Sequence, residues 1–344
     1  MRILACELDC VVPLRLSKIS QPKGSKQARD ENSYMKQNQG LPRADNFRFA
    51  TISMMRLTFA TLFTLISIAC ARNYTRCGTH TPPEWHLEQL KVVDSETNSR
   101  LGPINITTYV HIVTTPSKKT SVTPEMLMNQ MQVMNDAYSQ IGIFFTVADV
   151  DLTINKEWAS AALGSTPMRN MKRSLRKGTY SSLNLYFMSD VRDQYGMTGL
   201  LGQCYFPHAA ANASTLALDG CVILSDTLPG GNQTGYNHGF TAVHEVGHWF
   251  GLFHVFQMDD YFMNRPLFSC TGVGDGDMVD DTPPQSTMTV GCPADNTKDS
   301  CPNSPGFDSI HNFMDYSSDR CLTEFTPGQG DRARAKYREM RLGK

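Results

Sequence analysis

The sequence predicts an α/β domain that begins with a sheet-forming half and continues into an irregular half held by disulfide bonds. Between residues 104 and 254, β-branched and apolar runs alternate with segments of helical spacing. After residue 255 the regular pattern is lost, and Gly, Pro, Asp and Cys become frequent. The net charge is −1 and 19% of the residues are charged, so composition gives no argument for nucleic acid or another polyanion as a partner.

The segment "MMRLTFATLFTLISIACA", residues 54–71, has the three parts of a secretory signal. Arg56 supplies the positive start, an apolar run follows, and Ala-Cys-Ala at 69–71 forms a small-residue cleavage site before Arg72. The apolar run falls short of the roughly 20 residues that span a bilayer. We therefore expect a secreted, extracellular protein without a membrane anchor.

The chain on either side of this signal is polar. Residues 1–53 are mixed in charge and lack sustained periodicity, so we predict no fold for them. Because a signal normally stands at the N-terminus, we hypothesise that translation starts at Met54 or Met55 and that residues 1–53 are not part of the mature protein. Residues 72–100 contain Pro82-Pro83 and are expected to form an extended leader before the main domain, residues 101–344.

The first elements of the main domain are a strand and a helix. Residues 104–114, "INITTYVHIVT", are β-branched and partly alternating, which predicts a strand. Thr123 is a typical N-cap, and Pro124 suits the first helical position. Apolar residues then recur at helical spacing until Gly142 stops the run, and these are Leu127, Met131, Met134, Tyr138 and Ile141.

Further strands and two more helices complete the expected pattern. The strands are expected at 143–150, 182–189, 199–206 and 220–225. A short helix opens at Thr166-Pro167, and a charge run of this kind predicts a solvated face. Its basic residues are Arg169, Lys172, Arg173, Arg176 and Lys177. A final helix starts at Thr326-Pro327 and ends in basic residues.

The stretch "TAVHEVGHWFGLFH", which ends at His254, points to metal chemistry. His244 and His248 stand four residues apart, so on a helix they project from one face and can bind one zinc ion. Glu245 lies beside the first ligand, where it can take a proton from zinc-bound water. Gly251 can adopt the left-handed turn that ends a helix, which lets the chain deliver His254 as a third ligand. A fourth position stays open for water, which indicates a catalytic rather than a structural zinc.

A second motif, "HNFMDYSSDRC", places Met314 in a turn and Tyr316 two residues later. His-Glu-x-x-His-x-x-Gly-x-x-His followed by a methionine turn resembles the metzincin pattern. The details resemble the pappalysin (cytophagalysin) family, particularly its secreted fungal-type extracellular metalloproteases, from about residue 73 to residue 341. Astacins carry Glu after the third histidine and adamalysins carry Asp, where this chain has Val255. The matching stretches are "LNLYF" (183–187), "GFTAVHEVGHWFGLFHVF" (239–256), "DTPPQ" (281–285) and "NFMDYSSDRCLTEFTPGQGDR" (312–332).

This resemblance implies a metzincin fold. Such a fold has a twisted mixed sheet with a backing helix and an active-site helix, then an irregular, disulfide-stapled C-terminal subdomain that ends in a helix. One catalytic zinc ion would be bound by His244, His248 and His254, with Glu245 as general base and acid. The implied function is that of a secreted endopeptidase, which hydrolyses peptide bonds of extracellular polypeptides with zinc-activated water.

The resemblance also gives roles to the methionine turn and to the leader. Met314 would form the apolar floor beneath the metal site, and Tyr316 would help to stabilise the charged tetrahedral intermediate. Residues 72–100 would be a prosegment and residues 101–344 the catalytic domain. A catalytically inactive secreted binding protein with the same fold is the alternative, although no ligand and no general base is missing. A zinc-stabilised structural module fits poorly, because such sites usually have four protein ligands.

Seven of the ten cysteines remain when the first 71 residues are removed, and these are Cys77, Cys204, Cys221, Cys270, Cys292, Cys301 and Cys321. Seven is odd, so at least one thiol is unpaired within the mature chain. The last four lie in the irregular half and permit three connectivities, among which sequence alone does not choose. The resemblance to pappalysins favours the pairs Cys270–Cys301 and Cys292–Cys321 and leaves Cys204 and Cys221 to each other.

Cys77, in "TRCGTHT", is the odd cysteine. Three fates are open: an intermolecular disulfide, an idle thiol, or coordination of the catalytic zinc, whose fourth position a thiolate can take. Arg76 beside it would favour the thiolate. Metzincin leaders, including those of pappalysins, can hold the enzyme latent with such a cysteine. We therefore interpret Cys77 as a latency residue in a zymogen that is cleaved near Ser99-Arg100.

The acidic run "GDGDMVDDTP", residues 274–283, resembles a calcium-binding loop of the family. Asp277, Asp280 and Thr282 are its candidate oxygen ligands for a structural calcium ion, and a solvated acidic turn is the alternative. Four Asn-x-Ser/Thr sequons are compatible with glycosylation of a secreted protein, namely Asn73, Asn105, Asn212 and Asn232. Nothing in the sequence indicates the oligomeric state.

Overall fold

A computed structural model of the chain describes residues 74–91, 102–256, 270 and 276–344. The chain divides into two compact units, Met1–Ala69 and Cys70–Lys344, and the described residues all belong to the second. The signal predicted at 54–71, the segment before it, the sequon at Asn73 and the cleavage site near Ser99-Arg100 lie outside the described residues. No helix in the described ranges is long and apolar enough to cross a membrane.

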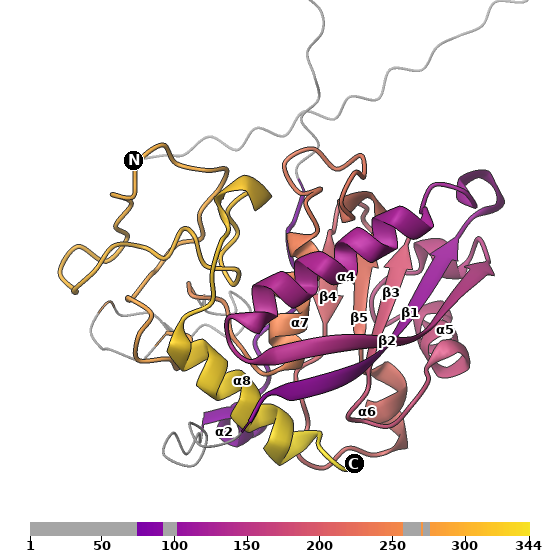
Figure 1. Cartoon of the computed structure of the whole chain (residues 1–344), viewed down its shortest axis with the longest axis horizontal. Helices are drawn as coiled ribbons and strands as arrows, with labels where there is room; N and C mark the ends of the chain where they lie inside the picture. Colours follow the sequence, from indigo (N-terminus) through magenta and orange to yellow (C-terminus); the bar gives the residue numbers. More distant parts are fainter. Residues whose placement is uncertain (1–73, 92–101, 257–269, 271–275) are drawn as a thin grey trace, which may run out of the picture. The chain divides into compact units, whose positions relative to one another are not determined.

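A five-stranded mixed sheet forms the centre of this unit (Figure 1). The strands lie in the order β2-β1-β3-β5-β4. β1, β2, β3 and β5 run parallel, and β4 pairs antiparallel with β5 at one edge. The bounds are β1 Ile104–Thr114, β2 Ile143–Ile154, β3 Leu183–Met188, β4 Gly202–Cys204 and β5 Cys221–Leu224. β2 is longer than the strand predicted at 143–150, and β4 is shorter than the strand predicted at 199–206.

Helices cover both faces of the sheet (Figure 1). α4 (Pro124–Ser139) and α7 (Phe240–Trp249) share one hydrophobic core with the sheet, and the Tyr138 hydroxyl of α4 donates to the Val243 carbonyl of α7 at 2.8 Å. α5 (Thr166–Leu175) packs against a second core, to which Met188 and Val222 of the sheet belong. The remaining helices of the described residues are α2 (Glu84–Lys91), α6 (Ala213–Leu218), α8 (Pro327–Met340) and four short 3-10 turns, Pro116–Lys118, Trp158–Ser160, Ser225–Thr227 and Asp319–Cys321.

The predicted helix starts are confirmed by their caps. The Thr123 side chain accepts from the Met126 N–H at the start of α4. Thr326 forms a capping box with Gln329 at the start of α8. The prediction of a solvated basic face on α5 is wrong at Lys172. This residue is buried, and its Nζ donates to the Leu218 and Gly220 carbonyls at 2.7 and 2.9 Å. Burial lowers the pKa of Lys172 to about 7.

The sequence pattern predicted an extended leader, but part of the leader is helical. Glu84–Lys91 form α2, whose Leu87 and Leu90 are buried in a small apolar cluster with Phe253 and Met340. Arg332 on α8 anchors this helix by donating to the Leu90 carbonyl at 2.8 Å. The N-terminal segment is therefore packed on the main domain through its own apolar side chains.

Disulfide bonds join Cys204 to Cys221, Cys270 to Cys301 and Cys292 to Cys321, the pairing that the resemblance implied. The first bond connects residues that are direct partners in the β4–β5 register. The other two lie in the chain after α7, where regular structure is sparse. Among the described cysteines Cys77 alone is unpaired, and it is buried.

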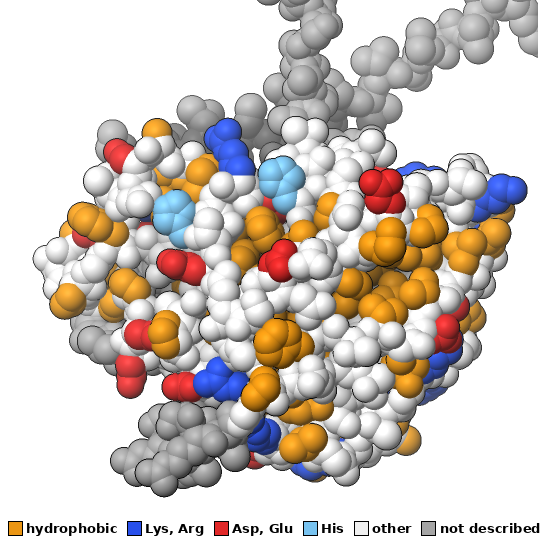
Figure 2. Space-filling model, in the orientation of Figure 1, with side chains coloured by type: hydrophobic (Ala, Val, Ile, Leu, Met, Phe, Trp, Pro, Cys, Tyr) orange, Lys and Arg blue, Asp and Glu red, His pale blue; other side chains and the backbone are white. Residues whose placement is uncertain are grey.

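An apolar groove of about 720 Å³ lies between α4 and the edge strand β2. Figure 2 shows apolar side chains gathered on this face. Met128, Val150 and Leu152 line the groove and are 67%, 45% and 51% exposed. Val150 and Leu152 of β2 thus place apolar side chains beside α4, but α4 does not cover them.

Two arginines near the C-terminus hold the end of α7. Arg332 Nε donates to the Gly251 carbonyl, and Arg341 Nε donates to the Trp249 carbonyl, both at 2.9 Å. These carbonyls belong to the helix end and to the turn after it, where cationic donors are favourable. Arg341 also pairs with buried Asp219 at 2.9 Å and lies over the Trp249 ring. Arg332 of α8 and Arg341 at its C-cap therefore hold the backbone in place where α7 ends.

We expect Arg341→Ala to lower the free energy of unfolding by about 3 kcal/mol, because it removes one partner of a buried ion pair. Urea denaturation of the secreted protein measures the change. Arg173→Ala, on the exposed face of α5, is the control and should change stability by no more than about 0.5 kcal/mol. Equal effects of the two substitutions would contradict the role of Arg341.

Candidate metal centre and active site

α7 carries the first two histidines of the motif. It begins after Gly239, which has a φ of 90°, and it is buried on nearly every side. His244 Nδ1 lies 2.7 Å from the Phe313 carbonyl, and His248 Nδ1 lies 2.8 Å from the Leu252 carbonyl. Since a carbonyl only accepts, each Nδ1 carries the proton, and each Nε2 is left with a lone pair.

The turn after α7 delivers the third histidine. Gly251 has a φ of 90°, as the motif predicted, and the Leu252 N–H returns to the Gly247 carbonyl at 2.9 Å. His254 then lies with its Nε2 3.1 Å from His248 Nε2. The candidate ligand atoms of Cys77 and the three histidines all lie within 4.8 Å of one another.

The imidazoles have the protonation state that metal binding needs. Burial lowers the pKa of His248 to about 4, and it lowers the pKa values of His244 and His254 well below the usual range. His244 Nε2 is buried and has no hydrogen-bond partner among the described residues. A buried, neutral, unpaired imidazole nitrogen beside two others fits a metal ion bound by three histidines.

Met314 packs against α7 at Gly247. A Cβ added at Gly247 would lie 2.4 Å from Met314 Sδ, so only glycine allows this approach. Gly247 is one of the unassigned positions of His-Glu-x-x-His, and the motif alone gave no reason for it. The Met314 N–H donates to Asn312 Oδ1 at 2.9 Å, which forms the turn.

Glu245 lies beside the histidines on α7, and its Oε2 accepts from Cys77 Sγ at 3.3 Å. It is fully buried, and burial raises its pKa to about 8. A Cβ added at Gly202 of β4 would lie 2.7 Å from Glu245 Cγ, so the edge strand passes close to this carboxyl group. Its Oε1 has no hydrogen-bond partner among the described residues.

The N-terminal segment lies along β4 and the residues just before it, and the Gly78 N–H donates to the Gly202 carbonyl of β4 at 2.9 Å. The Thr75 N–H donates to the Gly199 carbonyl and the Leu201 N–H to the Thr75 carbonyl, at 2.9 and 3.0 Å, in a parallel bridge. Cys77 Sγ lies 3.4 Å from His248 Nε2 and 3.3 Å from Glu245 Oε2. The Tyr316 hydroxyl donates to the Cys77 carbonyl at 3.2 Å. Cys77 and Tyr316, distant in sequence, are thus brought to the same site.

Arg76 does not act on Cys77 as the sequence predicted. Its guanidinium pairs with buried Asp319 at 3.2 Å, donates to the Ser317 carbonyl at 2.9 Å and lies over the Tyr236 ring. Burial and the nearby Glu245 raise the pKa of Cys77 well above its usual value. Asp319 is a site residue that sequence reasoning missed, although it lies within the quoted methionine-turn motif.

The remaining predicted residues lie away from this centre. Asp277 and Thr282 are hydrogen-bonded at 2.6 Å, and Asp277 Oδ2 is buried without a partner among the described residues. Asp280 is exposed, and the calcium site stays a prediction. The sequons at Asn105, Asn212 and Asn232 are exposed, so their acceptor residues lie on the surface.

The chain is similar in sequence to known families and proteins. The sequence profile of the M43 peptidase family, described as pregnancy-associated plasma protein-A, matches residues 175–337. An extracellular metalloprotease of Pyricularia oryzae is 42% identical over 297 residues, which cover 83% of this chain and 96% of that protein. An extracellular metalloprotease of Colletotrichum graminicola is 41% identical over 303 residues, which cover 83% of this chain and all of that protein (100%).

The chain is also similar to solved structures of a metalloprotease, mirolysin. Mature mirolysin of Tannerella forsythia, in complex with a cleaved peptide, has a TM-score of 0.56 and 27% identity, over 70% of this chain and 97% of that chain. A promirolysin mutant has a TM-score of 0.59 and 25% identity, over 77% of this chain and 97% of that chain. These likenesses confirm the metzincin fold. The chain therefore belongs to the M43, or pappalysin, family of metzincin metalloendopeptidases.

Proposed function

We propose that this protein is a secreted zinc-dependent endopeptidase that is latent while its N-terminal segment lies on the active site. The observation that carries the proposal is the convergence of three buried imidazoles on one point, with the Glu245 carboxyl group 3.3 Å from the Cys77 Sγ atom that lies among them. Three neutral histidines with a further position for water are a usual ligand set of catalytic zinc. The extracellular names of the relatives and the signal pattern at 54–71 support secretion.

Zinc, when bound by His244, His248 and His254, would supply Lewis acidity toward the scissile carbonyl and the attacking water. Burial alone raises the pKa of Glu245 to about 8, but the positive charge of a zinc ion bound beside it would favour the carboxylate form. That carboxylate would accept the proton of the water and pass it to the leaving amine. The Tyr316 hydroxyl, which here donates to the peptide carbonyl of Cys77, would donate to the substrate carbonyl as negative charge develops there.

The N-terminal segment would block this chemistry in two ways. Its backbone bonds to the edge strand, which is the place that an extended substrate would need. Cys77 Sγ lies among the ligand atoms, and a thiolate there would take the position of the attacking water. Metal binding would lower the thiol pKa and so overcome the raising effect of burial. We propose residues 72 to about 100 as the prosegment and residues 101–344 as the catalytic domain.

The buried site that Arg76 occupies would give the enzyme a substrate preference. Arg76 is the residue next to Cys77, and its side chain enters a buried site where Asp319 supplies a carboxylate. After the segment has left, this site would present a buried carboxylate and the Ser317 carbonyl to a substrate side chain. We propose that the enzyme cleaves next to an arginine or a lysine.

We expect Glu245→Gln to lower turnover by about 10²–10⁴-fold while zinc stays bound, since a general base is lost but no ligand is. Casein hydrolysis and zinc content, measured on the same sample, test this. His254→Ala is the contrasting variant and should lose zinc. Near-normal turnover of Glu245→Gln with one zinc bound would refute the mechanism.

Cys77→Ala in the full chain should give premature activity or self-digestion and leave the processed enzyme unchanged, because the thiol is removed only from the latent form. Casein hydrolysis by freshly secreted protein measures it. Thr75→Ala is the control, since Thr75 is exposed and bonds to Gly199 and Leu201 through its backbone. A Cys77 variant as latent as the wild type, or Cys77 in a disulfide, would rule out this switch.

Asp319→Asn should lower kcat/KM for cleavage next to arginine by about 10²-fold, because a hydrogen bond between charged groups is lost. Cleavage next to a neutral residue should change far less. Paired peptides that differ only at this residue, assayed with processed enzyme, give the two values. Asp136→Asn, on the exposed face of α4, is the control. The same loss for both peptides would show that Asp319 only maintains the fold.

A further inference from the structure

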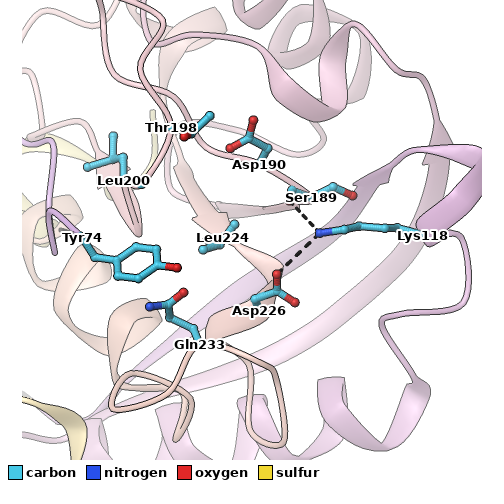
Figure 3. A pocket seen from close by; sticks show the side chains of 10 residues that line it. Tyr74, Lys118, Ser189, Asp190, Thr198, Leu200, Leu224, Asp226 and Gln233 are labelled. Carbon is cyan, nitrogen blue, oxygen red and sulfur yellow. Dashed lines mark hydrogen bonds and ion pairs between the residues drawn. The ribbon is translucent and has the colours of Figure 1, made fainter. Parts of the chain in front are cut away.

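A pocket of about 640 Å³ lies beyond the Arg76 site, at the far end of the edge strand. Gly199 and Leu200, which precede β4, form one wall, and Asp226 and Gln233 form another. Figure 3 shows Tyr74 extending its phenol ring into the pocket from one side and Lys118 reaching in from the other. The pocket is therefore shared between the catalytic domain and the N-terminal segment.

The position of this pocket relative to the metal centre is defined by the bound segment. Cys77 lies at the histidines, Arg76 at Asp319 and Tyr74 in the pocket. The chain bends at Arg76, whose guanidinium lies over the Tyr236 ring, and Tyr74 lines the pocket together with Gln233. Tyr236 and Gln233 belong to the same loop before α7, so the Arg76 site and the pocket are neighbours.

The lining suits a neutral aromatic side chain with a polar end. Leu200 and Leu224, which are buried, form the apolar part of the lining, and the other side chains that the catalytic domain contributes are polar or charged. Lys118 pairs with Asp226 at 3.5 Å and donates to the Ser189 carbonyl at 3.3 Å.

The other charge at the pocket is also paired, since Asp190 binds Arg192 at 2.8 Å. A charged substrate side chain would therefore compete with existing ion pairs, whereas a tyrosine side chain could bury its ring and form a hydrogen bond at the rim of the pocket.

We propose that this pocket is a distal substrate subsite that selects an aromatic side chain two residues from the basic residue, on the side away from the cut. Tyr74 occupies it in the latent chain, and a substrate tyrosine or phenylalanine occupies it after processing. This inference rests on the proposed function, because it takes its register from the Asp319 site and the metal centre. The pocket would thus add a second point of recognition to the basic residue beside the scissile bond.

The test uses the full chain, secreted and processed, with alanine-rich peptides that contain a single arginine. Tyrosine, phenylalanine, glutamate or alanine is placed two residues before or two residues after the arginine, and cleavage sites are mapped by mass spectrometry. Peptides with tyrosine or phenylalanine on the side of the arginine away from the cut should show about tenfold higher kcat/KM than the alanine peptide. The glutamate peptide should show no gain.

Thr198→Trp is the pocket-filling variant, since Thr198 is exposed at the rim. It should reduce the ratio of the tyrosine to the alanine peptide to near one. Thr120→Trp, at an exposed position outside the pocket, should keep the wild-type ratio. Equal kcat/KM for the tyrosine and alanine peptides in the wild type, or an unchanged ratio in Thr198→Trp, would overturn the subsite alone. Failure to cleave any peptide would overturn the proposed function.

Discussion

The Nε2 atoms of His248 and His254 lie 3.1 Å apart in a buried site, and the surrounding structure depends on keeping these imidazoles together. Backbone carbonyls of Phe313 and Leu252 hold the protons of His244 and His248 on the far side of each ring. Those carbonyls come from the methionine turn and from the turn after α7. The imidazoles are thereby oriented by two segments that are distant in sequence, and each segment must be packed with little freedom.

Glycines and arginines supply that packing. Gly247 lets Met314 approach α7 from below, and Gly251 turns the chain toward His254. Arg332 and Arg341 are buried, and each donates a hydrogen bond to a backbone carbonyl at the end of α7. Because Arg332 also binds Leu90 in α2, the same residue connects the N-terminal segment to the helix that carries two of the histidines.

The N-terminal segment uses the site as an extended peptide would. Its backbone bonds to the edge strand, and the Cys77 carbonyl receives the Tyr316 hydroxyl. Arg76 fills the carboxylate site at Asp319, and Tyr74 enters the next pocket. In the proposed latent form, inhibition and substrate recognition would therefore share one set of contacts, and the Cys77 thiol among the histidines would make the segment an inhibitor.

Much of this could be predicted from sequence, for identifiable reasons. β-branched runs and helix caps at Thr123 and Thr326 are local signals, and the structure has the elements they predict. The spacing of the histidines and Gly251 is also local, which is why the metal centre could be predicted. The burial of Lys172 and Cys77, and the pairing of Arg76 with Asp319, depend on contacts between distant segments. The local sequence around each of these residues gives no sign of the distant residue that it contacts.

X-ray absorption at the zinc edge of the full, unprocessed chain tests the central claim most directly. The account predicts one zinc ion with three nitrogen ligands at about 2.0 Å and one sulfur ligand at about 2.3 Å, with the sulfur replaced by oxygen after processing. A zinc ion with only nitrogen and oxygen ligands in the unprocessed chain would contradict the latency arrangement. Absence of bound zinc from both forms would contradict the metal centre itself.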